Sequence, residues 1–566
     1  MIAGRKSALG VLGLVSIWTI SAVGWGHLLP RISVWPGLFP VLVWSSTLAV
    51  LWLVAQPSRQ VFRSRLVSVV ILTVGLASLS ALVGLLPDRA TLQILGWGHD
   101  NSAHIFLAEA NAACGGLLPA CQSGLESVPS YLIEYPQGFS AAWASLPGAF
   151  TGSGLIASMP GYIAIYLLTS LALVVAAGWL AIALAHPSRW SWGAGVLSAL
   201  VLVFGVWSHQ FWSGFASFLW ASLIIVAFVV LREAGILGAG RLWFILALGT
   251  LTAVYYTHQL LLPFIAVYVA VDALRARQSL MATVRGAPIL IGGIVVPSLI
   301  LVALAPRSAQ GNSFLDQVVV EAGMEVIPLW VWVPLTVVGG FVFFARGDRD
   351  RVALRWAMLT SGGLFAGLAL LTIRVNGYVS YYPMKLLTFL TLILIAASAA
   401  VVVAKPIQTR ARQAWFSLAG LSVLALAVLP PLLRYPGFKT AYQGSTPSAL
   451  RTLATDLYGG GVQLCAPFVL QALEELPPDA GRVEIYRNGE LQPLEGRWIN
   501  QIRGYWDTQA WVNEVDWRPM ADLPDDARPD VIIGHDDVGV TPTGVLRLNL
   551  GEPCDRNQLP SVLPIG

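Results

Sequence analysis

The sequence predicts a polytopic α-helical membrane protein of about 13 spans with a small extracytoplasmic α/β domain at its C-terminus. Of the 566 residues, 56% are hydrophobic and only 11% are charged, whereas a soluble domain carries about 25% charge. Apolar runs of about 17–25 residues, long enough to cross a bilayer as helices, follow one another along residues 1–433. Residues 434–566 differ in composition, with eleven basic and eighteen acidic residues. These observations divide the chain into a membrane part and a polar tail.

The first apolar run follows Arg5 and Lys6 and has some features of a signal peptide. It is long for the hydrophobic region of a signal peptide and lacks a clear small-x-small cleavage site, which favours a retained first span. The expected spans are residues 8–28, 37–56, 66–86, 159–184, 190–207, 212–231, 242–256, 260–275, 287–305, 328–345, 356–373, 386–404 and 414–433.

Basic residues set the orientation of these spans. Of the 23 Lys and Arg residues in 1–433, eighteen fall in alternate connections and five in the others. Cytoplasmic loops carry an excess of Lys and Arg. We therefore expect a multi-pass plasma-membrane protein with a cytoplasmic N-terminus. An odd span count then puts the tail and the long connection 87–158 on the outer side.

The tail contains the signals of a mixed α/β structure. The segment 447–461, "PSALRTLATDLYGGG", is a helix candidate that ends in glycines. The segments "RVEIYR" (482–487), "DVIIGH" (530–535) and "GVLRLNL" (544–550) are strand candidates.

All four cysteines fall on the outer side of this topology. An oxidising compartment favours disulfides Cys114–Cys121 and Cys465–Cys554. A metal site is the alternative, but the spacing lacks paired C-x-x-C motifs.

A carboxylate and two imidazoles stand together in "GWGHDNSAHIFLAEAN", residues 96–111. Asp100 and His104 are four residues apart, which puts both on one face of a helix. Such a pair can accept and relay a proton, with His99 and Asn101 beside it as substrate-binding candidates. The alternative is that Asp100 only caps the helix, because Asp is a favoured N-cap residue.

A second polar segment of the same loop is "YLIEYPQGFSAAW", residues 131–143. Tyr135-Pro136-Gln137-Gly138 forms a turn that opens into an apolar helical stretch. Glu134, Tyr135 and Gln137 are candidates for substrate binding. The alternative is an interfacial helix anchored at the headgroups by its aromatic residues.

Cations are scarce on the outer side, and two of them bracket a tyrosine-rich segment in "RVNGYVSYYPMKLL", residues 374–387. Arg374 and Lys385 are suited to a lipid phosphate, with Tyr381 and Tyr382 beside them. The alternative is ordinary snorkelling at span ends. His258, in the break "YYTHQ", is a lesser phosphate-binding candidate or part of a simple turn.

This layout resembles the GT-C glycosyltransferases, and more closely the actinobacterial arabinofuranosyltransferases that prime galactan. The resemblance rests on three spans before an outer loop, on Asp100 near the loop's start and on the turn 135–138. "VYYTHQLLLPF" and "YYPMK" are further counterparts. The family turn usually reads Y-P-P-G, so Gln137 departs from it. No D-x-D motif accompanies Asp100, which leaves the participation of a divalent cation open.

The resemblance implies an inverting transferase that moves a sugar, in this family arabinofuranose, from a polyprenyl-phosphate donor to a cell-envelope glycan. Asp100 would be the general base, and Arg374, Lys385 and His258 would stabilise the leaving phosphate. The expected partners are the lipid-linked donor, the glycan acceptor and membrane lipids, with no nucleic acid. The alternatives are a polytopic transporter and a non-catalytic lipid- or glycan-binding assembly protein. Asp272 is the only acidic residue of the expected spans and lies at a cytoplasmic end, whereas transporters place several ionisable groups within their spans.

Overall fold

The computed structural model describes most of the membrane part and short segments of the tail. The described residues are 2–32, 35–55, 85, 88–96, 100–121, 132–133, 135–146, 148–150, 154–185, 190–211, 214–286, 292, 295–296, 298–301, 329–345, 351–377, 379–403, 410–432, 466–476, 483–487, 490–491, 498–500, 502–503, 531–534 and 546–548.

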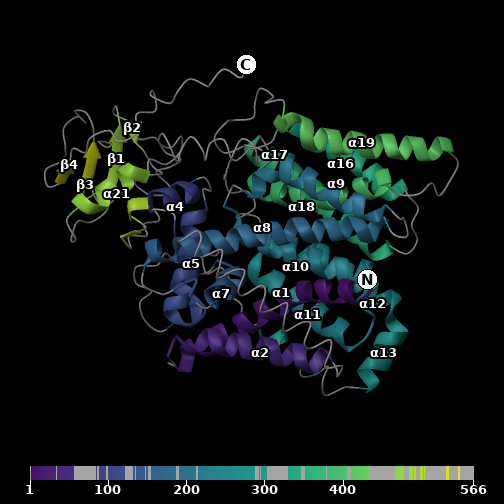
Figure 1. Ribbon diagram of the computed structural model, residues 1–566, viewed down its shortest axis with the longest axis horizontal. Helices are drawn as coiled ribbons and strands as arrows, with labels where there is room; N and C mark the ends of the chain where they lie inside the picture. The colour runs from purple at the N-terminus through teal and green to yellow at the C-terminus, as the bar shows by residue number, and fades with distance from the viewer. Residues whose placement is uncertain are drawn as a thin grey trace.

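The described chain is mainly a bundle of α-helices (Figure 1). In order they are α1 (Ile2–Leu28), α2 (Leu38–Ala55), α4 (Asp88–Leu95), α5 (Asn101–Cys114), α7 (Gly138–Ala144), α8 (Leu155–Ala185), α9 (Ser191–Phe204), α10 (Ala216–Glu233), α11 (Arg241–Thr257), α12 (Leu262–Arg275), α13 (Arg277–Gly286), α16 (Leu329–Ala345), α17 (Val352–Asn376), α18 (Tyr381–Val403), α19 (Arg410–Leu432) and α21 (Ala466–Glu475). Short 3-10 helices lie at Pro30–Ile32, Leu118–Ala120, Val206–Phe211 and Gln259–Leu261.

The composition and length of these helices make the chain an α-helical membrane protein. Four helices in the described residues are long and apolar enough to cross a bilayer, at Leu155–Ala185, Ala216–Glu233, Val352–Val375 and Tyr382–Val403. A fifth span is obtained if the bent pair Gln259–Arg275 and Arg277–Gly286, which meet at 85°, forms one span.

The described residues therefore provide fewer clear spans than the thirteen expected. Several expected spans correspond to helices of only 14–17 residues, such as α9, α11, α12 and α16. A helix of 14 residues is about 21 Å long, whereas the hydrocarbon core is about 30 Å thick. The expected spans 66–86 and 287–305 lie wholly or mostly outside the described residues. Runs of apolar residues located these helices, but the length of α9 was overestimated by four residues and that of α11 underestimated by two.

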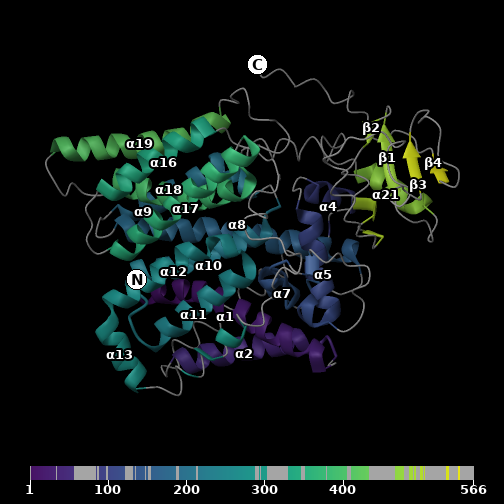
Figure 2. The same ribbon diagram turned by 180° about the vertical axis from the view of Figure 1, so that it is seen from behind.

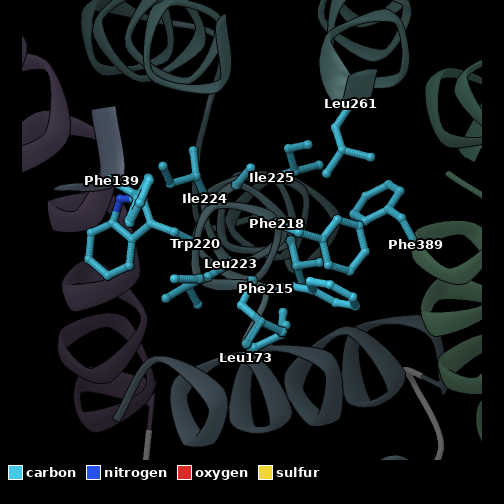
Figure 3. Packing of buried hydrophobic residues seen from close by; sticks show 14 of the residues in the cluster. Phe139, Leu173, Phe215, Phe218, Trp220, Leu223, Ile224, Ile225, Leu261 and Phe389 are labelled. Carbon is cyan, nitrogen blue, oxygen red and sulfur yellow. The ribbon is translucent and has the colours of Figure 1, made fainter. Parts of the chain in front are cut away.

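Helix α10 is the centre of the bundle. It packs against α1, α8 and α11, and 89% of its apolar window is buried. Figure 3 looks along α10 and shows its side chains radiating towards its neighbours, with Leu173 of α8 on one side and Phe389 of α18 on another. Its sequence, "ASFLWASLIIVAFVVLRE", is apolar on every face, as expected for a helix surrounded by other helices.

Buried ion pairs hold the helices together at one end of α10. Arg232 donates to both carboxylate oxygens of Asp272 on α12, at 2.7 and 2.9 Å, and the indole Nε1 of Trp243 on α11 donates to Asp272 at 2.7 Å. Glu233 accepts a hydrogen bond from the Tyr268 hydroxyl at 2.8 Å and lies 3.8 Å from Nε of Arg351. These contacts join α10, α11 and α12 to the start of α17.

We expect Asp272→Asn to destabilise the protein by about 3 kcal/mol. The substitution leaves the Arg232 guanidinium without its counterion in a partly buried position, and breaking a buried ion pair from one side costs about 3–5 kcal/mol. Thermal unfolding of the purified protein measures the effect. Glu474→Gln is the matched control, since Glu474 is exposed on α21. Equal melting temperatures for the two variants would contradict a stabilising role of the pair.

The opposite end of the bundle carries the loop helices and the tail. Figures 1 and 2 both show α4, α5 and α7 at one end of the long helices, with α21 and a small sheet beyond α4. Helix α21 packs against α4. Helix α21 of the tail therefore lies next to α4 of the loop 87–158, and the side of the membrane on which both lie stays a prediction.

The sheet consists of β1 (Val483–Arg487), β2 (Glu490–Leu491), β3 (Val531–Gly534) and β4 (Leu546–Leu548), in the order β2-β1-β3-β4. β1 and β2 are antiparallel, whereas β3 is parallel to both β1 and β4. β1, β3 and β4 each fall in one of the three segments expected as strands. The expected helix 447–461 lies outside the described residues, and α21 was not predicted.

Helix α5 ends in a turn that requires glycine. Gly115 has φ +67°, and a Cβ atom there would lie 2.7 Å from the backbone of Pro36. Its N–H bonds to the carbonyl of Ala112, which closes the helix. The predicted Cys114–Cys121 disulfide is confirmed and joins the end of α5 to the residue after the following 3-10 helix. Cys465 and Cys554 lie outside the described residues.

Candidate functional site

A polar cluster lies where α5, α7, α10, α11 and α18 meet at the loop-helix end of the bundle. The Asp100 carboxylate acts electrostatically on Tyr135, Tyr382 and Lys385. Lys385 and His104 in turn act on His258. The members of this Asp100 cluster are Asp100, His104, Tyr135, His258, Tyr382 and Lys385. Segments almost 300 residues apart in the sequence thus contribute to one site.

Asp100 stands at the N-cap position of α5, and its side chain makes no capping hydrogen bond. The Asp100 carbonyl accepts the N–H of His104 at 3.0 Å, so the first turn of α5 is regular and holds both residues on one face. Asp100 is half-buried and His104 is buried. The Asp100 carboxylate does not accept a hydrogen bond from the N–H groups at the start of α5. Helix capping therefore does not account for an aspartate at this position.

The ring of His104 is held by aromatic contacts. It lies edge-on to Phe139 of α7, with 4.8 Å between ring centroids, and is tilted against Tyr135 at 5.8 Å. These contacts fix the imidazole between α5 and the turn before α7. His104 is therefore a positioned side chain and not a mobile loop residue.

Lys385 enters the cluster from the first turns of α18. The helix begins at Tyr381, so Lys385 lies within the apolar span Tyr382–Val403, although the sequence placed it just before a span that starts at residue 386. Its side chain is buried, and its ammonium nitrogen lies 4.3 Å from the centroid of the Phe215 ring. A cation over an aromatic face is stabilised by the ring quadrupole. Asp100 supplies a negative charge in the same cluster.

His258 ends α11 and lies between that helix and the next 3-10 turn. Its ring meets the edge of Phe218 with a centroid distance of 5.7 Å. Burial holds the pKa of His258 well below its usual value of 6.5, and the charges of Lys385 and His104 lower it further. His258 is therefore neutral near pH 7, so it can donate or accept a hydrogen bond but adds no positive charge.

We expect a pH dependence of stability that is specific to His258. The folded state resists protonation of this imidazole while the unfolded chain binds a proton below about pH 6.5. Stability from this group is therefore present above pH 6.5 and is lost as the pH falls towards the lowered folded pKa. Unfolding measured from pH 7.5 to pH 5 should show a smaller loss in His258→Asn than in the wild type. An equal loss of stability in the wild type and in His258→Asn as the pH falls would contradict the lowered pKa of His258.

The turn 135–138 is built by close backbone approach. A Cβ atom on Gly138 would lie 2.8 Å from Oγ1 of Thr257 and 2.9 Å from the carbonyl oxygen of Tyr256, so α7 can begin against α11 only with glycine there. The Tyr135 hydroxyl lies 2.9 Å from the Ser217 hydroxyl on α10. Burial raises the pKa of Tyr135 above its usual value, and Asp100 adds to the rise, so the phenol stays protonated.

Two residues expected to contact substrate have structural partners instead. The Gln137 side chain accepts the N–H of Leu118 at 3.0 Å and donates to the carbonyls of Leu132 and Ile133 at 3.1 and 2.9 Å. Asn101 donates to the carbonyl of Leu95 at 2.9 Å and accepts from a tyrosine hydroxyl of α8. Both side chains are buried. They hold the loop in shape, because their amide groups are already used by the protein.

Several residues around the cluster were not predicted. Tyr162 of α8 donates to Oδ1 of Asn101 at 2.9 Å, and Tyr166, one turn later, donates to the Gln210 carbonyl at 3.3 Å. The two tyrosine rings stack at 6.0 Å. The two tyrosines are four residues apart in "GYIAIY", which puts both on one face of a helix. This spacing could have identified them from the sequence. Glu109 is also buried and accepts hydrogen bonds from the backbone of Gly154, at 2.8 Å, and from Ser158.

Of the remaining predicted residues, only Arg374 has a described side chain. Arg374 is exposed in the last turn of α17, and the described contacts do not connect it to Asp100 or Lys385. Tyr381 begins α18, but its side chain lies outside the described residues. His99 and Glu134 also lie outside them. Among the side chains that are described, no group of three His, Cys, Asp or Glu residues is arranged to hold a metal ion.

No family model, curated protein or solved structure matches the chain. The site is therefore interpreted from its own chemistry. It combines a half-buried carboxylate, a buried ammonium, a neutral imidazole and protonated phenols at one end of an apolar bundle. This combination can accept a proton at Asp100 and stabilise an anion at Lys385.

Proposed function

We propose that the protein is an inverting glycosyltransferase of the GT-C type that uses a polyprenyl-phosphate sugar as donor. The observation that carries the proposal is that the half-buried Asp100 carboxylate lies within electrostatic range of the buried Lys385 ammonium in one cluster. A glycosyl transfer from a lipid phosphate needs both a base for the acceptor hydroxyl and a cation for the leaving phosphate. The apolar surroundings suit a donor that is anchored in the bilayer.

In this mechanism Asp100 takes the proton from the acceptor hydroxyl as its oxygen attacks the anomeric carbon. The bond from that carbon to the phosphate oxygen breaks, and the polyprenyl phosphate leaves with the electron pair. Attack from the face opposite to the leaving group inverts the configuration. Lys385 stabilises the negative charge that develops on the phosphate. Tyr135, Tyr382 and the neutral His258 supply hydrogen bonds around the sugar.

The finer membrane arrangement belongs to the same proposal. A cytoplasmic N-terminus and an extracytoplasmic tail agree with the distribution of basic residues. The disulfide Cys114–Cys121 lies at the end of α5 opposite to Asp100, and disulfides persist in oxidising compartments. The cluster would then face the side on which lipid-linked sugars are used. Arabinofuranose as the sugar and a cell-envelope glycan as the acceptor rest on the family resemblance alone.

A donor comparison tests this function. The purified full chain is incubated with an oligosaccharide acceptor and either polyprenyl-phosphate arabinofuranose, other polyprenyl-phosphate sugars or nucleotide sugars. We expect glycan extension only with a lipid-linked donor, with inverted configuration at the new bond. Each donor is tested with and without divalent cations, which decides metal dependence separately. Lack of transfer from every lipid-linked donor, with specific binding of lipid or glycan, would favour the non-catalytic assembly protein.

A further inference from the structure

A shallow pocket lies at the end of the bundle remote from the Asp100 cluster. It is lined by the ends of four helices: Leu184 of α8, Val342 and Phe343 of α16, Ala397 and Val401 of α18, and Arg351 and Arg355 at the start of α17. Helices α16 and α17 both pack on α18, which forms the floor between them. The pocket therefore combines an apolar floor with a rim of two guanidinium groups.

The two arginines differ in their partners. Arg351 donates to the carbonyls of Leu184 and Ala183 at 3.0 and 3.2 Å and faces Glu233, so its charge is largely compensated within the protein. Arg355 is half-buried and makes one long contact, from Nη2 to the Phe344 carbonyl at 3.5 Å. No ion pair of Arg355 occurs within the described part of the chain. Most of its N–H donors have no acceptor among the described residues, and a half-buried guanidinium in this state is suited to an anion.

The surroundings identify the kind of anion. Three large apolar side chains near the pocket are exposed: Phe341 of α16 is 60% exposed, and Trp356 and Leu359 of α17 are 53% and 51% exposed. In a membrane protein such surfaces contact lipid, and tryptophan prefers the headgroup level. Basic pockets between membrane helices bind the headgroups of anionic lipids. Arg355 thus lies next to exposed apolar side chains that are suited to acyl chains and to the headgroup level.

We propose that this pocket binds the phosphate of an anionic membrane phospholipid, with Arg355 as its main ligand and the charge of Arg351 in support. The acyl chains would lie along the exposed side chains of α16 and α17. The site is distinct from the Asp100 cluster, because α10 separates the two ends by 17 residues, about 25 Å of helix. The proposal does not depend on the glycosyltransferase function.

Native mass spectrometry of the full chain tests the proposal, with phosphatidylglycerol and phosphatidylcholine as probes. We expect the wild type to retain phosphatidylglycerol in preference to phosphatidylcholine. Arg355→Gln should lower the affinity for phosphatidylglycerol at least about fivefold, as expected for the loss of one cation at a membrane surface. Arg277→Gln is the control, because Arg277 is exposed at the start of α13 and its loss removes the same charge outside the pocket.

A second variant and a competition experiment test the apolar part of the pocket separately from the charge of Arg355. Ala397→Leu fills the floor without changing the charge and should also weaken phosphatidylglycerol binding, so a folding defect of Arg355→Gln would not remove the test. Inorganic phosphate added in excess should displace little lipid, since a free ion lacks the apolar contacts. Equal lipid retention by wild type, Arg355→Gln and Ala397→Leu would overturn the proposal. Displacement of the lipid by inorganic phosphate alone would equally overturn it.

Discussion

Asp100→Asn should lower the rate of sugar transfer by about 10²–10⁴-fold, the usual cost of losing a general base. The amide has the size of the carboxylate but cannot accept the proton of the acceptor hydroxyl. Asn is as good an N-cap residue as Asp, and the Asp100 side chain makes no capping bond in the wild type. The helix α5 should therefore remain intact while turnover is lost. Transfer from polyprenyl-phosphate arabinofuranose, at matched amounts of folded protein, measures the effect.

Glu474→Gln is the matched control for this experiment. It makes the same change from carboxylate to amide at an exposed position of α21, where surface substitutions have little effect on stability. The control should keep wild-type turnover and melting temperature. Near-normal turnover in Asp100→Asn would exclude the general-base role. A loss of activity accompanied by a lower melting temperature would instead assign Asp100 to the support of α5.

The sequence located the main charged groups of the site because they are rare in an apolar chain. Asp100 and His104 were recognisable from their helical spacing, and Lys385 from the scarcity of cations on the expected outer side. The structure brings both segments into one cluster. Arg374, selected by the same reasoning as Lys385, is instead exposed on α17. Scarcity in the sequence identifies candidates, but only the packing of α18 against the bundle separates a buried cation from an exposed one.

The polar neighbours of the site could not be assigned from the sequence, because their roles depend on tertiary contacts. Gln137 was expected to bind substrate, yet its amide joins Leu118 to the backbone before the turn. Asn101 was expected beside the substrate, and its amide is held by Tyr162 of a distant helix. A side-chain amide has both donor and acceptor capacity. Its partners depend on what packs next to it and not on its neighbours in the sequence.

The burial of the membrane spans also depends on tertiary contacts that the sequence does not show. The apolar runs correctly located α8, α10, α17 and α18, but they could not tell a lipid-facing helix from a buried one. Only 28% of the apolar window of α17 is buried, against 89% for α10 and α18. In lipid, the exposed and the buried surfaces of a helix are both apolar. Hydropathy therefore does not indicate that α10 and α18 are the helices that position Phe215 and Lys385.

Lys385→Met should lower turnover by about 10²-fold, the effect of removing one preorganised group that stabilises developing negative charge. Methionine keeps the length and the apolar stem of lysine, so the packing against Phe215 is preserved. Turnover is compared at matched amounts of folded protein, because the loss of a cation near the Asp100 carboxylate also affects stability.

Arg374→Met removes the same charge from an exposed position at the end of α17 and is the matched control. If the cations act only by raising the surface potential, both substitutions should reduce transfer similarly, and the reduction should be weaker at high salt. If Lys385 contacts the leaving phosphate, only Lys385→Met should impair turnover, and salt should have little influence because the ammonium is buried over the Phe215 ring. Steady-state transfer at low and high ionic strength distinguishes these outcomes. Unchanged turnover in Lys385→Met would remove Lys385 from the mechanism.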